Sequence, residues 1–283
     1  MKRISLLIIV MSVFFVGAHA QIKERYMKVN KTDGSTIAIK VKDVADITFE
    51  EVNKTETKTF VANGISFTMI LVEGGTFQMG STSGYSDEKP VHNVTLSDYY
   101  IGETEVTQEL WQAVMGSNPS CCSKGSKLPV EKVSWNDCQT FITKLNELTG
   151  QNFRLPTEAE WEFAAKGGTQ SKGYTYSGSN TIGDVAWYTS NSSSKTHEVA
   201  TKAPNELGIY DMSGNVWEWC QDWYSSSYYS SSPQNNPTGS SPGSSRVFRG
   251  GSWSDSVAYC RSAFRLYGNP ALSNYALGFR LAH

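Results

Sequence analysis

A glycine-rich segment near the C-terminus carries residue types that could do chemistry. It reads Arg249-Gly-Gly-Ser-Trp-Ser-Asp255, and Cys260 follows it. A cysteine thiolate can bind a soft metal ion or take part in redox chemistry, and the carboxylate of Asp255 can act as an acid or a base. Cysteine is also among the most buried residue types. We therefore favour a buried or disulfide-bonded Cys260, with Cys220 as a candidate partner. Ser252 has no histidine or aspartate partner evident from the sequence that would make it a nucleophile.

Other sequence blocks accompany this segment along the chain. They include Arg154-Leu-Pro-Thr-Glu-Ala-Glu-Trp-Glu162, Gly208-Ile-Tyr-Asp-Met-Ser-Gly-Asn-Val-Trp-Glu-Trp219 and Leu277-Gly-Phe-Arg-Leu281. Together they resemble the formylglycine-generating enzyme family, also called sulfatase-modifying factors, over residues 66–282. The resemblance implies an α+β fold, a loop-rich variant of the C-type lectin fold. The composition agrees, because 24 glycines, 14 tyrosines and 8 tryptophans suit irregular backbone anchored by large rings.

One position departs from the pattern of the family oxidases. In those enzymes a cysteine follows the Gly-Gly-Ser-aromatic segment, a second comes five positions later, and the two thiolates hold copper(I) as a near-linear pair. Here Asp255 stands at the first position and Cys260 at the second. A carboxylate oxygen is a hard donor and a poor match for copper(I). We therefore expect an exported binding or scaffold module that is not a functional copper oxidase.

Two enzymatic alternatives stay open from the sequence. The chain could be a copper-dependent, formylglycine-generating oxidase that acts on a sulfatase peptide, if Cys220 replaced the missing thiol in space. It could also be a different enzyme that uses Asp255 as acid or base, and Ser252 matches an active-site serine of the family. A non-catalytic module would instead bind a protein or a glycan on its loop surface. The candidate contact surface is Trp223–Ser232, because tyrosines offer adaptable, amphipathic contact area: Tyr224, Tyr228 and Tyr229.

The resemblance also implies a structural calcium site around Gly214. Carried over residue by residue, the ligands are the carboxylates of Asp211 and Glu218 and the backbone oxygens of Gly214 and Val216. Calcium prefers several hard oxygens on a bent loop, and a glycine permits the bend. The alternative is an ordinary glycine turn with two tryptophans in the core, Trp217 and Trp219. A second family calcium site aligns only loosely with this chain, near Asp184, Val185 and Asn191.

Capping signals and residue patterns predict the elements that position these groups. Helices are expected over 108–115 after Thr107, from Ser134 to Thr149, and over 159–166 after a capping box of Thr157 and Glu160. Strands are expected over 67–72 and, broken by glycine bends, over 74–80. Arginines near the glycine-rich and aromatic segments are expected to tie loops together through carbonyls and carboxylates: Arg249, Arg261, Arg265 and Arg280.

The N-terminal part of the chain is expected to form separate units. Residues 1–20 combine a basic start, an apolar run and the small-x-small site Ala18-His19-Ala20, which is typical of a secretion signal. Residues 21–50 are predicted to form a small β unit with a hairpin around Asp33-Gly34. Residues 51–59 are predicted to be a linker, and residues 60–283 the main domain. Export would place the protein in the periplasm or outside the cell.

Charge and cysteine content exclude several classes of partner. The formal net charge of −2 gives no broad attraction to nucleic acid or to an anionic membrane. No stretch after the signal is long and apolar enough to cross a membrane.

Few histidines are present and none has metal-ligand spacing, so a histidine metal site is not expected. The five cysteines are odd in number, and adjacent Cys121 and Cys122 are not expected to bond each other because the vicinal ring strains the peptide.

Overall fold

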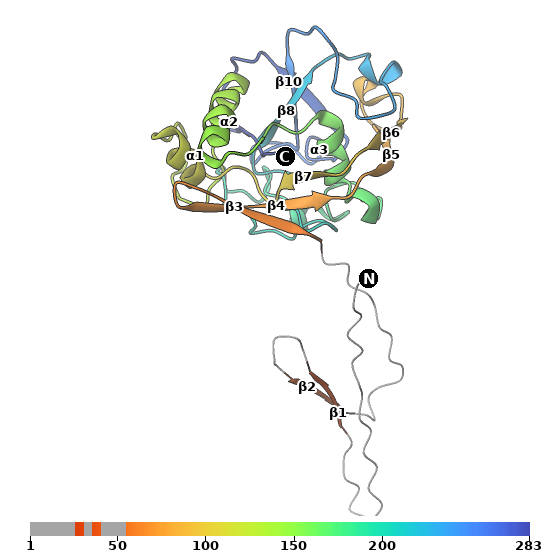
Figure 1. The fold of residues 1–283 in the computed structure, drawn as a ribbon. Coiled ribbons are helices and arrows are strands. Elements are labelled where there is room, and N and C mark those ends of the chain that lie inside the picture. The colour runs from red at the N-terminus through yellow and green to blue at the C-terminus, as the bar shows by residue number, and fades with distance from the viewer. Residues whose placement is uncertain (1–25, 31–35, 41–54) are drawn as a thin grey trace, which may run out of the picture. The chain divides into compact units, whose positions relative to one another are not determined.

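The computed structural model describes residues 26–30, 36–40 and 55–283, and the chain divides into two units between Asn53 and Lys54 (Figure 1). In the first unit, β1 (Tyr26–Asn30) pairs antiparallel with β2 (Thr36–Lys40). This is the strand pair predicted around the Asp-Gly turn, and the turn itself is outside the described residues. The predicted secretion signal lies outside them as well.

Three small sheets form the β framework described in the second unit. The first has the order β3 (Thr57–Ala62), β4 (Ile65–Val72), β7 (Tyr99–Gly102), and the second pairs β5 (Gly75–Met79) with β6 (His92–Leu96). The third has the order β10 (Arg265–Gly268), β9 (Arg246–Arg249), β8 (Trp217–Trp223), β11 (Leu277–Gly278). All strand pairs are antiparallel except β8 with β11. β4 and β5 confirm the predicted strands, whereas β3 begins at Thr57, inside the stretch predicted to be a linker.

The helices begin where the capping signals predicted. α1 (Gln108–Met115) is capped by Thr107, α2 (Trp135–Thr149) by the capping box of Ser134 and Asp137, and α3 (Glu158–Ala165) by that of Thr157 and Glu160. Four single-turn elements complete the helical content of the described residues: η2 (Ser86–Glu88), η3 (Gly168–Gln170), α4 (Ile182–Val185) and η4 (Tyr228–Ser230). In the described residues, no helix has the length and apolar character needed to cross a membrane.

Helix α3 (Figure 1) contacts strands of both the second sheet, β5 and β6, and the third sheet, β8 and β9. Every residue of α3 is buried, including three glutamates. One cluster of apolar side chains packs α1 and α2 against the C-terminal strands, and another packs α3 against β5, β6 and β7. Trp217 and Trp219 are both buried. A helix that is buried all round needs partners for its charges. The third sheet supplies those of Glu158 and Glu162, and Arg154 supplies that of Glu160.

Buried arginines of the third sheet pair with the glutamates of α3. Arg249 on β9 binds Glu162, and Arg265 on β10 binds Glu158 through two contacts of 2.6 and 2.8 Å. Burial alone would raise the pKa of Glu162, but the cations of Lys166 and Arg249 lower it to about 2. The expectation that these arginines are structural is confirmed. Arg280 and Arg261 are likewise paired, with Glu218 and Glu88.

Candidate functional site

The Gly-Gly-Ser segment forms a turn directly after β9, and this turn brings Ser252 and Asp255 together. The backbone N–H of Asp255 donates to the carbonyl of Ser252 at 3.1 Å, and the Ser252 hydroxyl donates to Oδ2 of Asp255. The indole Nε1 of Trp217 donates to the same oxygen at 2.8 Å. Ser252 is completely buried. No acidic partner of Ser252 was evident from the sequence, and the four-residue turn 252–255 supplies one, Asp255.

Cys260 lies against the glycine pair of this turn. A Cβ atom placed on Gly251, whose φ is +72°, would come within 2.8 Å of the Cys260 sulfur. The thiol is completely buried and forms no disulfide. Burial, and then the negative charge of Asp255, raise its pKa to about 12. A raised pKa is typical of a packed, structural cysteine, whereas reactive cysteines have a lowered one.

Cys220 has different surroundings and is not the disulfide partner of Cys260. It lies in β8 among the apolar residues packed around α3, and its sulfur is 3.9 Å from the carbonyl oxygen of Glu218. Burial, followed by the charges of Asp222 and Glu158, raises its pKa well above the usual value. The five cysteines all lie in the described residues and all are unpaired. One cysteine beside a carboxylate offers copper(I) a single soft donor, whereas the two-thiolate arrangement expected for the family oxidases offers two.

The segment expected to bind calcium places Asp211 and Glu218 in a buried acidic cluster. Both oxygens of Glu218 contact the guanidinium of Arg280, at 2.6 and 2.7 Å, and Trp161 Nε1 donates to one of them at 2.7 Å. Asp211 is buried at a φ of +59°, and its Oδ2 accepts from the amide of Ala200 at 2.8 Å. Its Oδ1 has no partner. The orphaned oxygen of Asp211 thus fits a cation, whereas Glu218 would first have to leave Arg280.

Glu105 joins this cluster, although the sequence analysis did not select it. Its two oxygens accept from the side-chain amide of Asn215, at 2.7 Å, and from the backbone N–H of Val216, at 3.0 Å. Burial raises the pKa of Glu105 well above its usual range, and the charges of Asp211 and Glu218 add to the effect. Burial also raises the pKa of Asp211, to about 6. No local sequence feature signals Glu105, which lies more than a hundred positions from its partners in the chain.

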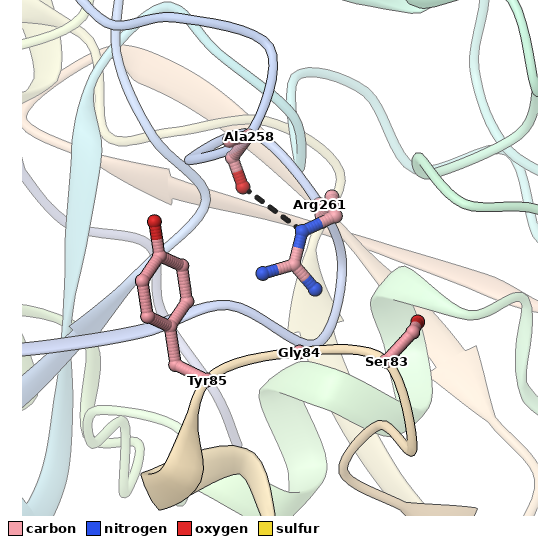
Figure 2. A pocket seen from close by; sticks show the side chains of 5 residues that line it. All are labelled: Ser83, Gly84, Tyr85, Ala258 and Arg261. Atoms are coloured by element: carbon pink, nitrogen blue, oxygen red, sulfur yellow. Dashed lines mark hydrogen bonds between the residues drawn. The ribbon is translucent and has the colours of Figure 1, made fainter.

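A cavity of about 350 Å³ lies next to the Cys260 segment. Figure 2 shows the Tyr85 ring on one side and the guanidinium of Arg261 on the other, with the backbone of Gly84 between them. Ser83 and Ala258 complete the lining. Arg261 is fixed because its Nε donates to Ala258 at 3.0 Å and its other nitrogens bind Glu88 at 2.8 and 2.6 Å. The cavity therefore offers an aromatic ring, a hydroxyl and a held cation.

The predicted contact surface over Trp223–Ser232 is wrong in part. Tyr229 is buried, and its hydroxyl is 3.4 Å from Glu158 and 3.5 Å from Glu162. The hydroxyl of Tyr224 donates to Asp87 at 2.9 Å, and its ring stacks on Tyr267. The amide of Gly239 donates to the Tyr228 hydroxyl at 3.1 Å. These tyrosines anchor a loop to the core. The tyrosine- and serine-rich sequence of this segment does not show which tyrosines are buried.

Comparisons with known proteins agree with this architecture. Residues 54–283 match the family described as "Sulfatase-modifying factor enzyme 1-like domain". A Paenibacillus barcinonensis protein named chaperone protein LppX is 40% identical, over 68% of this chain and 81% of the relative. The formylglycine-generating enzyme of Streptomyces coelicolor is 31% identical, over 76% of this chain and 88% of that enzyme. The solved structure of Treponema denticola variable protein 1 has a TM-score of 0.73 at 41% identity, over 80% of this chain and 98% of that one. This chain therefore belongs to the sulfatase-modifying factor family and has its loop-rich α+β, formylglycine-generating-enzyme fold.

Proposed function

We propose that this protein is an exported family member that does not catalyse copper-dependent oxidation and acts as a binding or scaffold module. The arrangement at the two copper positions supports the proposal. Asp255 is held by Ser252 and Trp217, and Cys260 is a buried thiol whose pKa is raised to about 12. Since copper(I) binds thiolates and disfavours hard carboxylate oxygen, this pair lacks the donors that the oxidation requires.

The names of the relatives are consistent with more than one role for this domain. One relative is named a chaperone and another a formylglycine-generating enzyme. A fold does not determine a function, so the function has to be inferred from the residues at the site. At the site of this chain, the residues favour binding over oxidation.

A peptide assay tests the absence of oxidation. The protein is incubated with copper, a reductant and a Cys-x-Pro-x-Arg peptide, and the product is measured by mass spectrometry. No aldehyde is expected above the level of a reaction without protein. The Streptomyces coelicolor relative provides the positive control. Aldehyde formation by this protein would overturn the proposal.

The cavity beside Arg261 is the ligand site that the geometry favours. Its Tyr85 ring is 52% exposed, so it is available for stacking or edge contacts. Its arginine is already neutralised by Glu88, which disfavours a strongly anionic ligand. A peptide or a glycan fits better, because carbonyl and hydroxyl groups can bind Ser83 and the remaining guanidinium N–H groups.

Binding to peptide and glycan arrays tests this site. Tyr85→Ala should weaken a detected interaction by about tenfold or more, as expected for an aromatic anchor. The matched control is Tyr275→Ala, because Tyr275 is 51% exposed but does not line the cavity. If both variants lose the same affinity, or if neither loses any, the cavity is not the ligand site.

Calcium and export complete the proposal. Asp211 is the carboxylate that supports a structural calcium site, together with the backbone oxygens of Gly214 and Val216. Glu218 would join only by exchanging Arg280 for the ion.

Export rests on the sequence of residues 1–20. N-terminal sequencing of the protein from exporting cells should begin at Gln21, and an intact Met1 on the exported protein would contradict cleavage.

A further inference from the structure

Three potential metal ligands meet in the loop that follows α1, away from the turn at Asp255. The sulfurs of Cys121 and Cys122 are 3.6 Å apart, and the Cys121 sulfur is 3.8 Å from Oε2 of Glu131. One ligand atom from each residue lies within 4.8 Å of the other two. Both cysteines are exposed, whereas Glu131 is completely buried.

The carboxylate of Glu131 is held in position by the loop that carries the thiols. Its Oε1 accepts from the backbone amides of Cys121, at 2.6 Å, and Cys122, at 3.2 Å. The Ser120 hydroxyl accepts from the Glu131 amide at 3.2 Å. Asn118 connects the loop to α1 through Gln108, at 2.9 Å. With Oε1 occupied, Oε2 is the oxygen left for a ligand, and it lies beside the thiol of Cys121.

Two of the three separations between these atoms match those around a tetrahedral ion. A zinc–sulfur bond of about 2.3 Å and a tetrahedral angle place two sulfurs about 3.8 Å apart, and a zinc–oxygen bond of about 2.1 Å places sulfur and oxygen about 3.6 Å apart. The observed separations, 3.6 and 3.8 Å, agree with both. A linear copper(I) pair would separate the sulfurs by twice the metal–sulfur bond, and a disulfide would bring them to about 2 Å. Two thiolates and one carboxylate are also a donor set that zinc accepts.

We propose that Cys121, Cys122 and Glu131 form a zinc(II) site, with a fourth coordination position open to water. The exposed thiols give the ion a path of entry, and the buried carboxylate is positioned before the ion arrives. Binding clamps the segment between the thiols and Glu131, because Cys121 and Cys122 lie ten and nine positions before Glu131 in the chain. The site is independent of the Asp255 turn and of the proposed ligand cavity.

Metal titration of the mature, tag-free, reduced protein tests the site. Zinc is titrated in competition with a chromophoric chelator, and one ion per chain is expected with a Kd below 1 µM, about what a three-ligand site supports. Cobalt(II) bound in place of zinc should show thiolate-to-metal charge-transfer absorption. The double variant Cys121→Ser with Cys122→Ser should lose at least about 100-fold in affinity and the charge-transfer band.

Two further variants separate ligation from folding. Ser126→Ala changes an exposed residue of the same loop, and its zinc affinity should equal that of the unmodified protein. Glu131→Gln should weaken zinc about tenfold while keeping the cobalt–thiolate band, and the melting temperature of the metal-free protein shows whether it folds. Less than one zinc per chain, or unchanged affinity in the double variant, would overturn the assignment. A disulfide between Cys121 and Cys122 in exported protein grown with zinc would overturn it as well.

Discussion

The indole of Trp217 donates its N–H to the carboxylate of Asp255 across 2.8 Å. Trp217 opens β8, so the residue at the first copper position is tied directly to a core strand. One carboxylate oxygen of Asp255 accepts the hydrogen bonds of both Trp217 and Ser252. A cysteine thiol at this position would be a much weaker acceptor. Asp255 is thus integrated into the turn as a hydrogen-bond acceptor, and replacing it has consequences for both metal affinity and stability.

The change Asp255→Cys should increase copper(I) affinity about tenfold or more, because it supplies a second soft donor near Cys260. It should also cost about 1–3 kcal/mol of stability, because Trp217 and Ser252 lose their acceptor. Competition with a copper(I) chelator and thermal melting measure the two effects. Asp255→Asn is the matched control, since it keeps an acceptor oxygen without a thiol. Equal copper affinity in both variants would contradict the assignment of position 255.

The variant Gly251→Ala should be strongly destabilised by contact with Cys260. Gly251 and Gly173 share a φ of +72°, but a Cβ atom at Gly173 meets nothing within 4 Å. Gly173→Ala therefore measures the backbone strain alone, about 1 kcal/mol. Gly251→Ala should cost about 1–3 kcal/mol more, because the added carbon overpacks the site. Denaturant unfolding of both variants measures the difference, and equal losses would show that the packing around Cys260 is looser than described.

The variant Glu162→Gln should destabilise the fold by about 3–5 kcal/mol at pH 7. It removes the nearer of the two carboxylates that pair with Arg249, whose side chain is completely buried. Glu147→Gln changes an exposed carboxylate of α2 and should cost less than about 0.5 kcal/mol. Chemical unfolding gives both values. A loss at position 162 as small as at position 147 would mean that Arg249 finds other partners.

The same residue predicts a pH dependence in acid. Since the pKa of Glu162 is lowered to about 2 from an ordinary value of 4.5, the folded state favours the ionised form. Its contribution to stability is complete above pH 4.5 and is lost as the pH falls toward 2. The difference in stability between the unmodified protein and Glu162→Gln should therefore shrink over this interval. A constant difference would exclude Glu162 as the titrating group.

Removal of calcium should lower the melting temperature, and added calcium should restore it. Only the folded loop presents the Asp211 carboxylate together with the backbone oxygens, so the ion stabilises by mass action, about 2.7 kcal/mol at 100 times its Kd. Asp211→Asn should abolish the response without breaking the Glu218–Arg280 pair. Glu198→Gln, in the exposed part of the neighbouring loop, should keep it. If chelator does not change the melting temperature, Arg280 is the cation that neutralises these buried carboxylates and calcium is not bound.

Local signals in the sequence identified the helices and the residues of the Gly-Gly-Ser turn. Capping boxes at Ser134 and Thr157 work because the cap and its partner are three residues apart, a contact that the sequence itself displays. The family motifs identified the fold. Asp255 lies in the turn that follows β9, and Cys260 packs against the glycines of that turn. The pairing of Ser252 with Asp255 was equally local but was missed.

Contacts between distant segments explain what the sequence could not predict. Glu105 meets Asn215 across 110 positions, and Tyr229 meets Glu158 across 71. A tyrosine in a serine-rich stretch has the same local pattern whether it is buried or exposed, so the contact surface over Trp223–Ser232 was overestimated. The pairing of Glu218 with Arg280 likewise depends on the course of the chain and not on the spacing around Gly214.

The bond between Arg261 and Glu88 joins residues 173 positions apart, and it holds the wall of the cavity. Such a contact forms only after a long loop has closed, so the cavity should be assembled late in folding and opened early in unfolding. Binding of a ligand in the cavity would therefore depend on the folding of the whole second unit. Its binding would shift the global unfolding transition, and partly folded chains would be unable to retain it.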